Sequence, residues 1–116
     1  MIGLDHIQLA IPREGEAACR AFWGDLVGLA ELEKPRTLRQ RGGCWFRLDG
    51  AELHLGVEER FSPAKKAHPG FRVDEIEGLA SRLSEGGHAI TWDATIPGRK
   101  RFFTEDPFGN RLEFLG

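Results

Sequence analysis

The chain has 116 residues, with 16 basic and 18 acidic side chains and a net charge of −2. This length suits one domain with a sizeable core, and the balanced charge argues against nucleic acid as a partner. The first residues show neither the basic nor the apolar segment of a secretion signal, and no apolar run approaches the roughly 18 residues of a membrane span. We therefore expect a cytoplasmic protein that has no membrane partner.

Residues 3–11 alternate between apolar and polar side chains, which predicts a strand with His6 and Gln8 on its polar face. Residues 14–27 carry apolar side chains at four-residue spacing and end before Gly28, as an amphipathic helix does. The chain is therefore expected to begin with a strand followed by a helix.

Four further features complete the first half. A short strand is predicted at 29–33, and a basic, polar loop at 34–42. Residues 44–48 and 52–57 have the character of strands, and Asp49-Gly50 between them is a typical hairpin turn. The first half thus ends in two antiparallel strands.

The strand at 52–57 places Glu52 and His54 on one face and its apolar residues on the other. The next segment, 58–67, is charged, contains Pro63 and has no periodicity. We expect a linker there.

The order of elements repeats after the linker. Residues 68–73 predict a strand, and an apolar stripe in the following residues predicts a helix that ends at Gly86-Gly87. Asp74 and Glu77 have the spacing of a capping box at the start of this helix. Three strands are predicted after the helix, at about 88–93, 100–105 and 111–115. Each half is therefore a strand, a helix and three strands.

The last strand follows a turn sequence, Asp106-Pro-Phe-Gly-Asn110, and places Glu113 between Leu112 and Phe114. Leu112 and Phe114 share one face of the strand, so Glu113 lies on the other. A carboxylate on an inward face needs a partner, because burial without one costs roughly 2–7 kcal/mol even for a neutral polar group. Glu113 is therefore expected to have one.

The two halves can be superimposed in sequence. His6 then falls on His68 and His54 on Glu113, and the sequence numbers differ by 62 in the first pair and by 59 in the second. A change of loop length accounts for the difference. Any one of these histidines could be an ordinary strand residue, but together the symmetry-related positions favour a metal site. His88 stays outside the repeat and is expected to be a surface residue.

Three segments of the sequence carry a resemblance to a known family. They are Leu4-Asp-His-Ile7, His68-Pro-Gly-Phe-Arg-Val-Asp74 and Asp106-Pro-Phe-Gly-Asn-Arg-Leu-Glu113. In this order they resemble the vicinal oxygen chelate superfamily, which includes glyoxalase I, fosfomycin and bleomycin resistance proteins, methylmalonyl-CoA epimerase and extradiol dioxygenases. The resemblance covers nearly the whole chain.

The resemblance implies an α+β fold in a single domain, residues 1–116. Two βαβββ modules, 1–57 and 68–116, are joined by the linker 58–67 and would form a U-shaped mixed sheet around a central metal-binding cavity. This is the glyoxalase/bleomycin resistance/dioxygenase fold. The resemblance also implies a homodimer, in which one site draws either on one chain or on two.

By the same resemblance, one divalent metal ion is held by His6, His68 and Glu113. Many members take a further ligand from the strand that here carries Glu52 and His54. The overlay of the two halves favours His54, but Glu52 lies on the same face about 7 Å along the strand, so both stay open. Imidazole and carboxylate ligands suit Zn, Ni, Mn, Co or Fe(II), and the ligand set does not choose among them.

Further residues are expected around the metal. Glu113 or Glu52 would act as a general base if displaced from the ion. Gln8 points into the cavity and would either bind the substrate or form part of the wall. Trp45 and Arg47 would supply an apolar wall and a clamp for an anionic group.

The remaining candidates have structural interpretations. We expect Trp23 and Trp92 to lie in the core. Cys19 and Cys44 lack C-x-x-C spacing and are expected to be core thiols without a disulfide. The run Arg99-Lys100-Arg101 is expected to be a solvated hairpin rather than part of a substrate site.

The leading functional hypothesis is a glyoxalase-like, metal-dependent enzyme of the lyase or isomerase type. It would act on a small, oxygen-rich molecule that chelates the metal through two vicinal oxygens. Ring-cleaving dioxygenase activity is less favoured, since typical extradiol dioxygenases carry additional modules. The alternative is a metal-free protein that sequesters a drug or antibiotic, as bleomycin resistance proteins do, but the aligned histidines argue against it.

Overall fold

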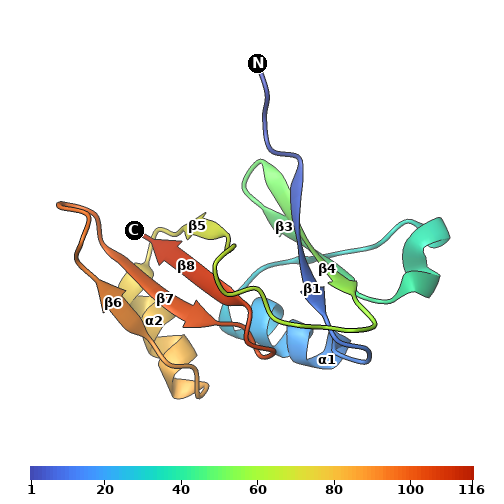
Figure 1. Cartoon of the computed structure of the whole chain (residues 1–116). Coiled ribbons are helices and arrows are strands. Elements are labelled where there is room, and N and C mark those ends of the chain that lie inside the picture. Colours follow the sequence, from blue (N-terminus) through green and yellow to red (C-terminus); the bar gives the residue numbers. More distant parts are fainter. The chain divides into compact units, whose positions relative to one another are not determined.

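Two units, Met1–Pro63 and Ala64–Gly116, make up the chain in a computed structural model that describes all 116 residues. Each unit has one four-stranded mixed sheet and a helical segment between its first and second strands (Figure 1). The predicted α+β class and the βαβββ order are confirmed in both units.

The sheet of unit 1, residues 1–63, has four strands. They are β1 (His6–Ile11), β2 (Glu31–Leu32), β3 (Cys44–Leu48) and β4 (Ala51–Val57). Their order across the sheet is β1-β4-β3-β2, with β1 parallel to β4 and the other neighbours antiparallel. The alternation of β1 buries Leu9 and Ile11 and leaves His6 and Gln8 on the opposite face.

The predicted helix of unit 1 is present, but only its beginning is an α-helix. It consists of α1 (Glu16–Cys19) and a π-helical continuation, η1 (Arg20–Leu26). The N–H of Val27 donates to the carbonyl of Phe22, five residues back, which is the wider hydrogen-bond spacing of a π-helix. Phe22 and Trp23 are both buried and anchor the segment in the core.

Both cysteines belong to this core. Cys19 and Cys44 are buried and form no disulfide, which confirms the prediction of core thiols. A hydrogen bond from Cys19 lowers the pKa of the Cys44 thiol. Phe46, Leu53 and Leu55 from the central strands complete the apolar layer.

The basic segment at 34–42 contains a short 3₁₀ helix, η2 (Arg36–Arg41), where the sequence predicted a loop. The segment has no apolar periodicity, so its helical turn could not be recognised from the pattern. It is tied to the rest of unit 1 by Glu16, whose carboxylate accepts a 2.7 Å hydrogen bond from the N–H of Gly43. This bond lowers the pKa of Glu16.

The sheet of unit 2, residues 64–116, repeats the arrangement of unit 1. Its strands are β5 (Gly70–Arg72), β6 (Thr91–Asp93), β7 (Arg101–Glu105) and β8 (Arg111–Leu115), in the order β5-β8-β7-β6. Helix α2 (Ile76–Glu85) lies along one face of the sheet (Figure 1). The buried side of the helix and the buried side of β7 and β8 supply the core: Ile76, Leu79, Leu83, Phe102, Leu112 and Phe114.

Three predictions for unit 2 are wrong, of which the one for Arg101 is described with the candidate site. The capping box is absent, because the helix begins after Glu75 without a side-chain cap, and Glu77 instead pairs with Lys100. Trp92 is 46% exposed rather than in the core. It lies on β6, a three-residue strand at the edge of the sheet, where one side of the indole has no neighbouring strand.

A fixed turn leads into β8. Asp106 accepts hydrogen bonds from the N–H groups of Phe108 and Asn110, each at 2.9 Å, and Gly109 adopts a positive φ of 94°. Asn110 is 1% exposed and accepts a 2.9 Å bond from the N–H of Ala64. Burial raises the pKa of Asp106 more than these hydrogen bonds lower it. The turn therefore fixes where β8 begins.

Equivalent residues of the two sheets differ in number by the same amounts as in the sequence repeat. Gln8 lies opposite His54 in the β1–β4 pair, and Gly70 lies opposite Glu113 in the β5–β8 pair. The residue numbers again differ by 62 on the first strand and by 59 on the last. His54 and Glu113 therefore occupy equivalent places in the two units.

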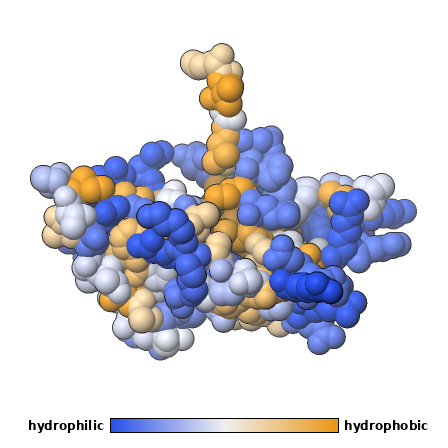
Figure 2. Space-filling view, in the orientation of Figure 1, coloured by the Kyte–Doolittle hydropathy of each residue, from blue (hydrophilic) through white to orange (hydrophobic).

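The segment before β1 extends from the end of the sheet (Figure 1), and it is apolar where most of the visible surface is hydrophilic (Figure 2). Met1, Ile2 and Leu4 are exposed. None of the helices has the length and apolar character that a membrane span requires.

Candidate functional site

The candidate residues lie on the side of each sheet opposite the buried core side chains, which we call the open face. In unit 1 the open face carries His6, Gln8, Trp45, Arg47, Glu52 and His54. In unit 2 it carries Arg101, Phe103, Arg111 and Glu113, with His68 just before β5. Period-2 alternation put the sequence-predicted residues on these faces, and the structure agrees.

Three rings are stacked across the open face of unit 1. The imidazole of His54 lies between His6 and Trp45, with centroid distances of 4.3 Å and 3.8 Å and interplanar angles of 17° and 2°. His54 lies on β4, an inner strand, so neighbouring strands cover its side chain from both sides. It is only 6% exposed. The stack holds the ring in one orientation.

Asp5 is a residue that the sequence analysis missed. Its carboxylate lies 2.7 Å from Nδ1 of His6. A carboxylate accepts hydrogen bonds, so Nδ1 carries a proton, and Nε2 has the lone pair of the neutral ring. This is the arrangement by which a carboxylate orients a metal-binding histidine. The signal was the position of Asp5 directly before His6 in the opening segment.

The two alternatives for the fourth metal ligand bind each other. Nε2 of His54 lies 2.9 Å from Oε1 of Glu52, two residues away on the same face. With the proton of a neutral His54 on Nε2, its other ring nitrogen keeps the lone pair. The structure therefore joins His54 and Glu52 in one pair and does not choose between them.

The predicted substrate-binding residues of unit 1 differ in their surroundings. The amide of Gln8 lies directly over Gly56, where an added Cβ would come within 2.7 Å of its Nε2. Trp45 is half-buried in the ring stack. Arg47 is exposed and lies opposite Glu52, and its side chain forms no hydrogen bond or ion pair.

A chain of polar contacts crosses the open face of unit 2. Nε2 of His68 lies 2.9 Å from Oε1 of Glu113, and Oε2 of Glu113 accepts a 2.9 Å hydrogen bond from Arg101. His68 also contacts the carbonyl of Lys66 through Nδ1, at 2.9 Å. The sequence predicted a partner for Glu113, and the structure shows two.

Arg101 is the residue whose role the sequence analysis mistook. It was expected in a solvated hairpin, but its side chain is only 16% exposed. Its guanidinium donates to Glu113, to Asp93 at 3.1 Å and to the hydroxyl of Thr95 at 3.0 Å. The signal was its period-2 spacing from Phe103, which puts Arg101 on the same face as Glu113.

The pairing with Arg101 sets the charge of the site. Burial alone would raise the pKa of Glu113, but hydrogen bonds with His68 and Arg101 together outweigh burial, so the pKa is lowered. The hydrogen bond to Glu113 also raises the pKa of Arg101. Glu113 is therefore a carboxylate and Arg101 a cation at neutral pH.

The donor atoms in each unit suit a divalent metal ion in their chemistry. Neither unit by itself brings together three His, Cys, Asp or Glu side chains that could hold an ion. Each supplies a pair: His6 with His54 or Glu52 in unit 1, and His68 with Glu113 in unit 2. Neither pair is by itself a complete metal site.

The pair in unit 2 gives a specific test of fit. Nδ1 of His68 must donate to the Lys66 carbonyl, so Nε2, 2.9 Å from the Glu113 carboxylate, has a lone pair when the ring is neutral and donates a proton to Glu113 when the ring is charged. The 2.9 Å contact therefore needs either a proton on Nε2, as in an ordinary ion pair, or a cation that both groups bind. Two ligand atoms that each lie about 2.1 Å from one ion are about 3.0 Å apart when adjacent in an octahedral site and about 3.4 Å apart in a tetrahedral one. The spacing of His68 and Glu113 therefore fits a common metal.

Comparisons with known proteins agree with this fold. The family model of the glyoxalase/bleomycin resistance protein/dioxygenase superfamily matches residues 3–114. A crystal structure of a Bacillus anthracis protein assigned to the glyoxalase family is 44% identical, with a TM-score of 0.95, covering 99% of this chain and 94% of that one. No curated protein matches the chain in sequence.

Two other solved structures are similar at lower identity. A glyoxalase/dioxygenase from Nostoc punctiforme is 25% identical, with a TM-score of 0.79, covering 97% of this chain and 89% of that one. A lactoylglutathione lyase from Agrobacterium tumefaciens is 16% identical, with a TM-score of 0.77, covering 99% of this chain and 93% of that one. At 16% identity the likeness shows the fold alone.

Proposed function

Because the chain belongs to the glyoxalase/bleomycin resistance protein/dioxygenase superfamily, we propose that it is a glyoxalase-like enzyme that depends on a divalent metal ion. The reaction would be of the lyase or isomerase type, on a small, oxygen-rich molecule that chelates the ion through two vicinal oxygens. The observation that carries the proposal is the 2.9 Å approach of His68 Nε2 to Glu113 Oε1, which places an imidazole nitrogen and a carboxylate oxygen side by side as potential ligands of one ion.

His6, His68 and Glu113 would hold the ion, with either His54 or Glu52 as the fourth ligand. Zn, Ni, Mn, Co and Fe(II) all suit these donors. When bound, the ion supplies a Lewis acid that stabilises negative charge on a substrate oxygen.

The chain's own residues orient the donors and move the proton. Asp5 fixes the tautomer of His6, and the Lys66 carbonyl does the same for His68. We assign the general base to Glu52 or Glu113, the two carboxylates on the open faces. A base must lie within hydrogen-bond reach of the carbon-bound proton that it removes.

Three side chains of unit 1 would contact the substrate. Gln8 would donate or accept a hydrogen bond, Trp45 would present an apolar ring, and Arg47 would attract an anionic group. Arg47 has no competing partner within its unit, which supports this assignment. A homodimer is our proposal for the assembly.

One observation favours the alternative, a metal-free protein that binds a drug or antibiotic. Arg101 already neutralises Glu113 through a 2.9 Å hydrogen bond, which is what a carboxylate in a site without metal needs. The aromatic surface of Trp45 would suit a planar ligand. The two hypotheses differ in whether chemistry occurs.

A hydrogen-exchange experiment separates them. Protein loaded in turn with Zn, Ni, Mn, Co and Fe(II) is incubated in D₂O with α-hydroxy ketones, hemithioacetals and α-hydroxy acids, and proton NMR follows loss of the carbon-bound proton. We expect metal-dependent exchange of at least one compound class, abolished in Glu113→Gln and kept in His88→Gln. Binding without exchange under every metal would support the metal-free alternative.

A further inference from the structure

We propose that a cavity beside β7 and β8 in unit 2 is an anion subsite, where Arg111 binds a carboxylate or phosphate group of the substrate. The cavity has a volume of about 830 Å³, within the range of small-molecule sites, and its lining includes Arg111, Phe103, Thr91 and Lys65. The inference rests on the proposed function in one respect, since it assumes that the ligand of this cavity is the substrate of the proposed metal-dependent reaction.

Arg111 is held in place without being neutralised. Its guanidinium lies over the ring of Phe103, 4.3 Å from the centroid. Its side chain forms no hydrogen bond and no ion pair, although its backbone N–H donates to Ala64. Stacking immobilises the planar group while the N–H edges remain open, and such a fork binds the two oxygens of a carboxylate or phosphate.

The other charges that border the cavity already have partners. Lys65 donates to Glu105 at 2.8 Å and to the carbonyl of Gly109 at 2.7 Å. Two carboxylates line the cavity, Glu105 and Asp106. Asp106 accepts hydrogen bonds from backbone N–H groups of the turn that leads into β8. Glu105 lies directly across from Arg111 in the strand register but bonds to Lys65 instead. Arg111 is therefore the cation of this cavity that lacks a counter-ion.

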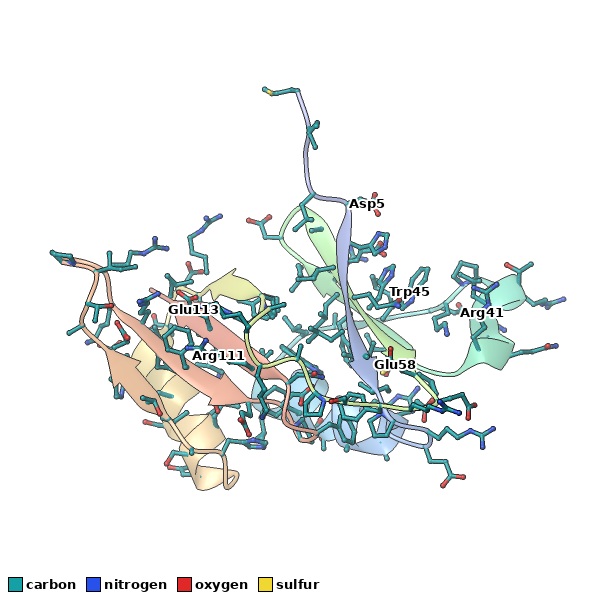
Figure 3. The ribbon with its side chains drawn as sticks, viewed as in Figure 1. Asp5, Arg41, Trp45, Glu58, Arg111 and Glu113 are labelled. Carbon is teal, nitrogen blue, oxygen red and sulfur yellow. The ribbon has the colours of Figure 1, made fainter.

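The position of Arg111 relates the subsite to the proposed metal site. Arg111 and Glu113 project from the same face of β8, two residues apart, which is about 7 Å along a strand (Figure 3). Phe103, the platform under Arg111, lies opposite Glu113 on β7. A substrate that reaches both residues carries chelating oxygens at one end and an anionic group several bonds away. Neutral diols and ketones have no anionic group and would therefore lack the contact with Arg111.

The test measures anion binding in metal-free protein. Uniformly ¹⁵N-labelled protein, treated with EDTA, is titrated separately with inorganic phosphate and with propionate while amide shifts are followed. We expect saturable shifts at Thr91, Phe103 and Arg111, with affinity at least tenfold weaker in Arg111→Gln. Arg111→Lys should lie between, because an ammonium has no planar fork. The stronger of the two anions identifies the group that the substrate carries.

Arg99→Gln is the matched control, because it removes the same charge from an exposed position on the β6–β7 loop. Equal weakening in Arg99→Gln and Arg111→Gln would overturn the proposal, since only net charge would then matter. Shifts that never saturate in the wild type, with either anion, would also overturn it. Thermal unfolding of each variant shows that it is folded. Since no metal is present, the outcome is independent of whether the protein binds one.

Discussion

The imidazole of His54 lies face to face on the indole of Trp45, with ring centroids 3.8 Å apart and planes 2° apart. A metal ion bound by His54 or by its neighbour His6 would therefore lie close to one indole. Trp92 is exposed at the edge of the other sheet, and Trp23 is buried under the first. The three tryptophans thus report on different surroundings.

We predict that Co²⁺ or Ni²⁺, both of which quench fluorescence at short range, lowers the tryptophan emission mainly through Trp45. The change should be lost in Trp45→Phe and kept in the control Trp92→Phe, followed by fluorescence titration. Quenching that survives in Trp45→Phe and disappears in Trp92→Phe would place the metal away from the ring stack.

Asp5→Asn should weaken metal binding without removing a ligand. The carboxylate holds Nδ1–H of His6 at 2.7 Å, and loss of such an orienting partner typically costs 10–100-fold in metal affinity. Isothermal titration with Zn²⁺ measures the change. Asp25→Asn, at an exposed position of unit 1, removes the same charge and serves as the control. Equal affinity in the two variants would show that Asp5 does not orient a ligand.

Arg101→Met should destabilise the fold, because it leaves hydrogen-bonding groups of Glu113 and Asp93 without their partner. Glu113 and Asp93, which Arg101 bridges, have side chains only 12% and 25% exposed. Urea unfolding of Arg101→Met and of Arg99→Met, an exposed neighbour, gives the comparison. If both variants unfold at the wild-type midpoint, the bridge contributes nothing to stability.

Gly43→Ala should be more damaging than Gly50→Ala, although both glycines have a positive φ, 82° and 73°. The strain of such a backbone costs about 1–2 kcal/mol for a residue with a Cβ. At Gly50 an added Cβ meets nothing, whereas at Gly43 it runs into the backbone carbonyl of Leu55. The free energies of unfolding should therefore differ clearly, and equal values would contradict the close approach.

Glu16→Gln should reduce stability in a pH-dependent way. The hydrogen bond from Gly43 lowers the pKa of Glu16 below its ordinary value of 4.5. A lowered folded-state pKa stabilises the protein above 4.5, and this contribution is lost as the pH falls through the folded-state pKa. Unfolding at neutral pH should thus be easier for Glu16→Gln, with the difference narrowing below pH 4.5. A difference that stays constant with pH would rule out this linkage.

The sequence predicted the fold well because the two periodicities in it are strong. The alternation around Glu113 and His54 determined which side chains face away from the core, and the strands at 44–48 and 111–115 have the predicted bounds. The helix ending before Gly87 is also confirmed, and Gly87 has a φ of 91°. These features depend on neighbours close in the chain.

Features that depend on which residue a side chain contacts were missed. Arg101 was taken for a solvated hairpin residue, since its bonds to Asp93 and Glu113 join three strands. Trp92 was expected in the core, but its position on an edge strand leaves it exposed. Asp5 was not singled out, although it directly precedes His6, because sequence order does not show that its carboxylate contacts Nδ1. The sequence pattern predicts on which face of the sheet a side chain lies, but it does not predict which residue that side chain contacts.

The most direct test of the central claim is the metal content of the purified, tag-free protein, by mass spectrometry. The account predicts about one ion per chain, lost in His6→Ala, His68→Ala and Glu113→Ala and kept in His88→Ala. A parallel comparison of His54→Ala and Glu52→Ala would identify the fourth ligand. Absence of any bound ion after reloading with Zn, Ni, Mn, Co and Fe(II) would contradict the metal-dependent function.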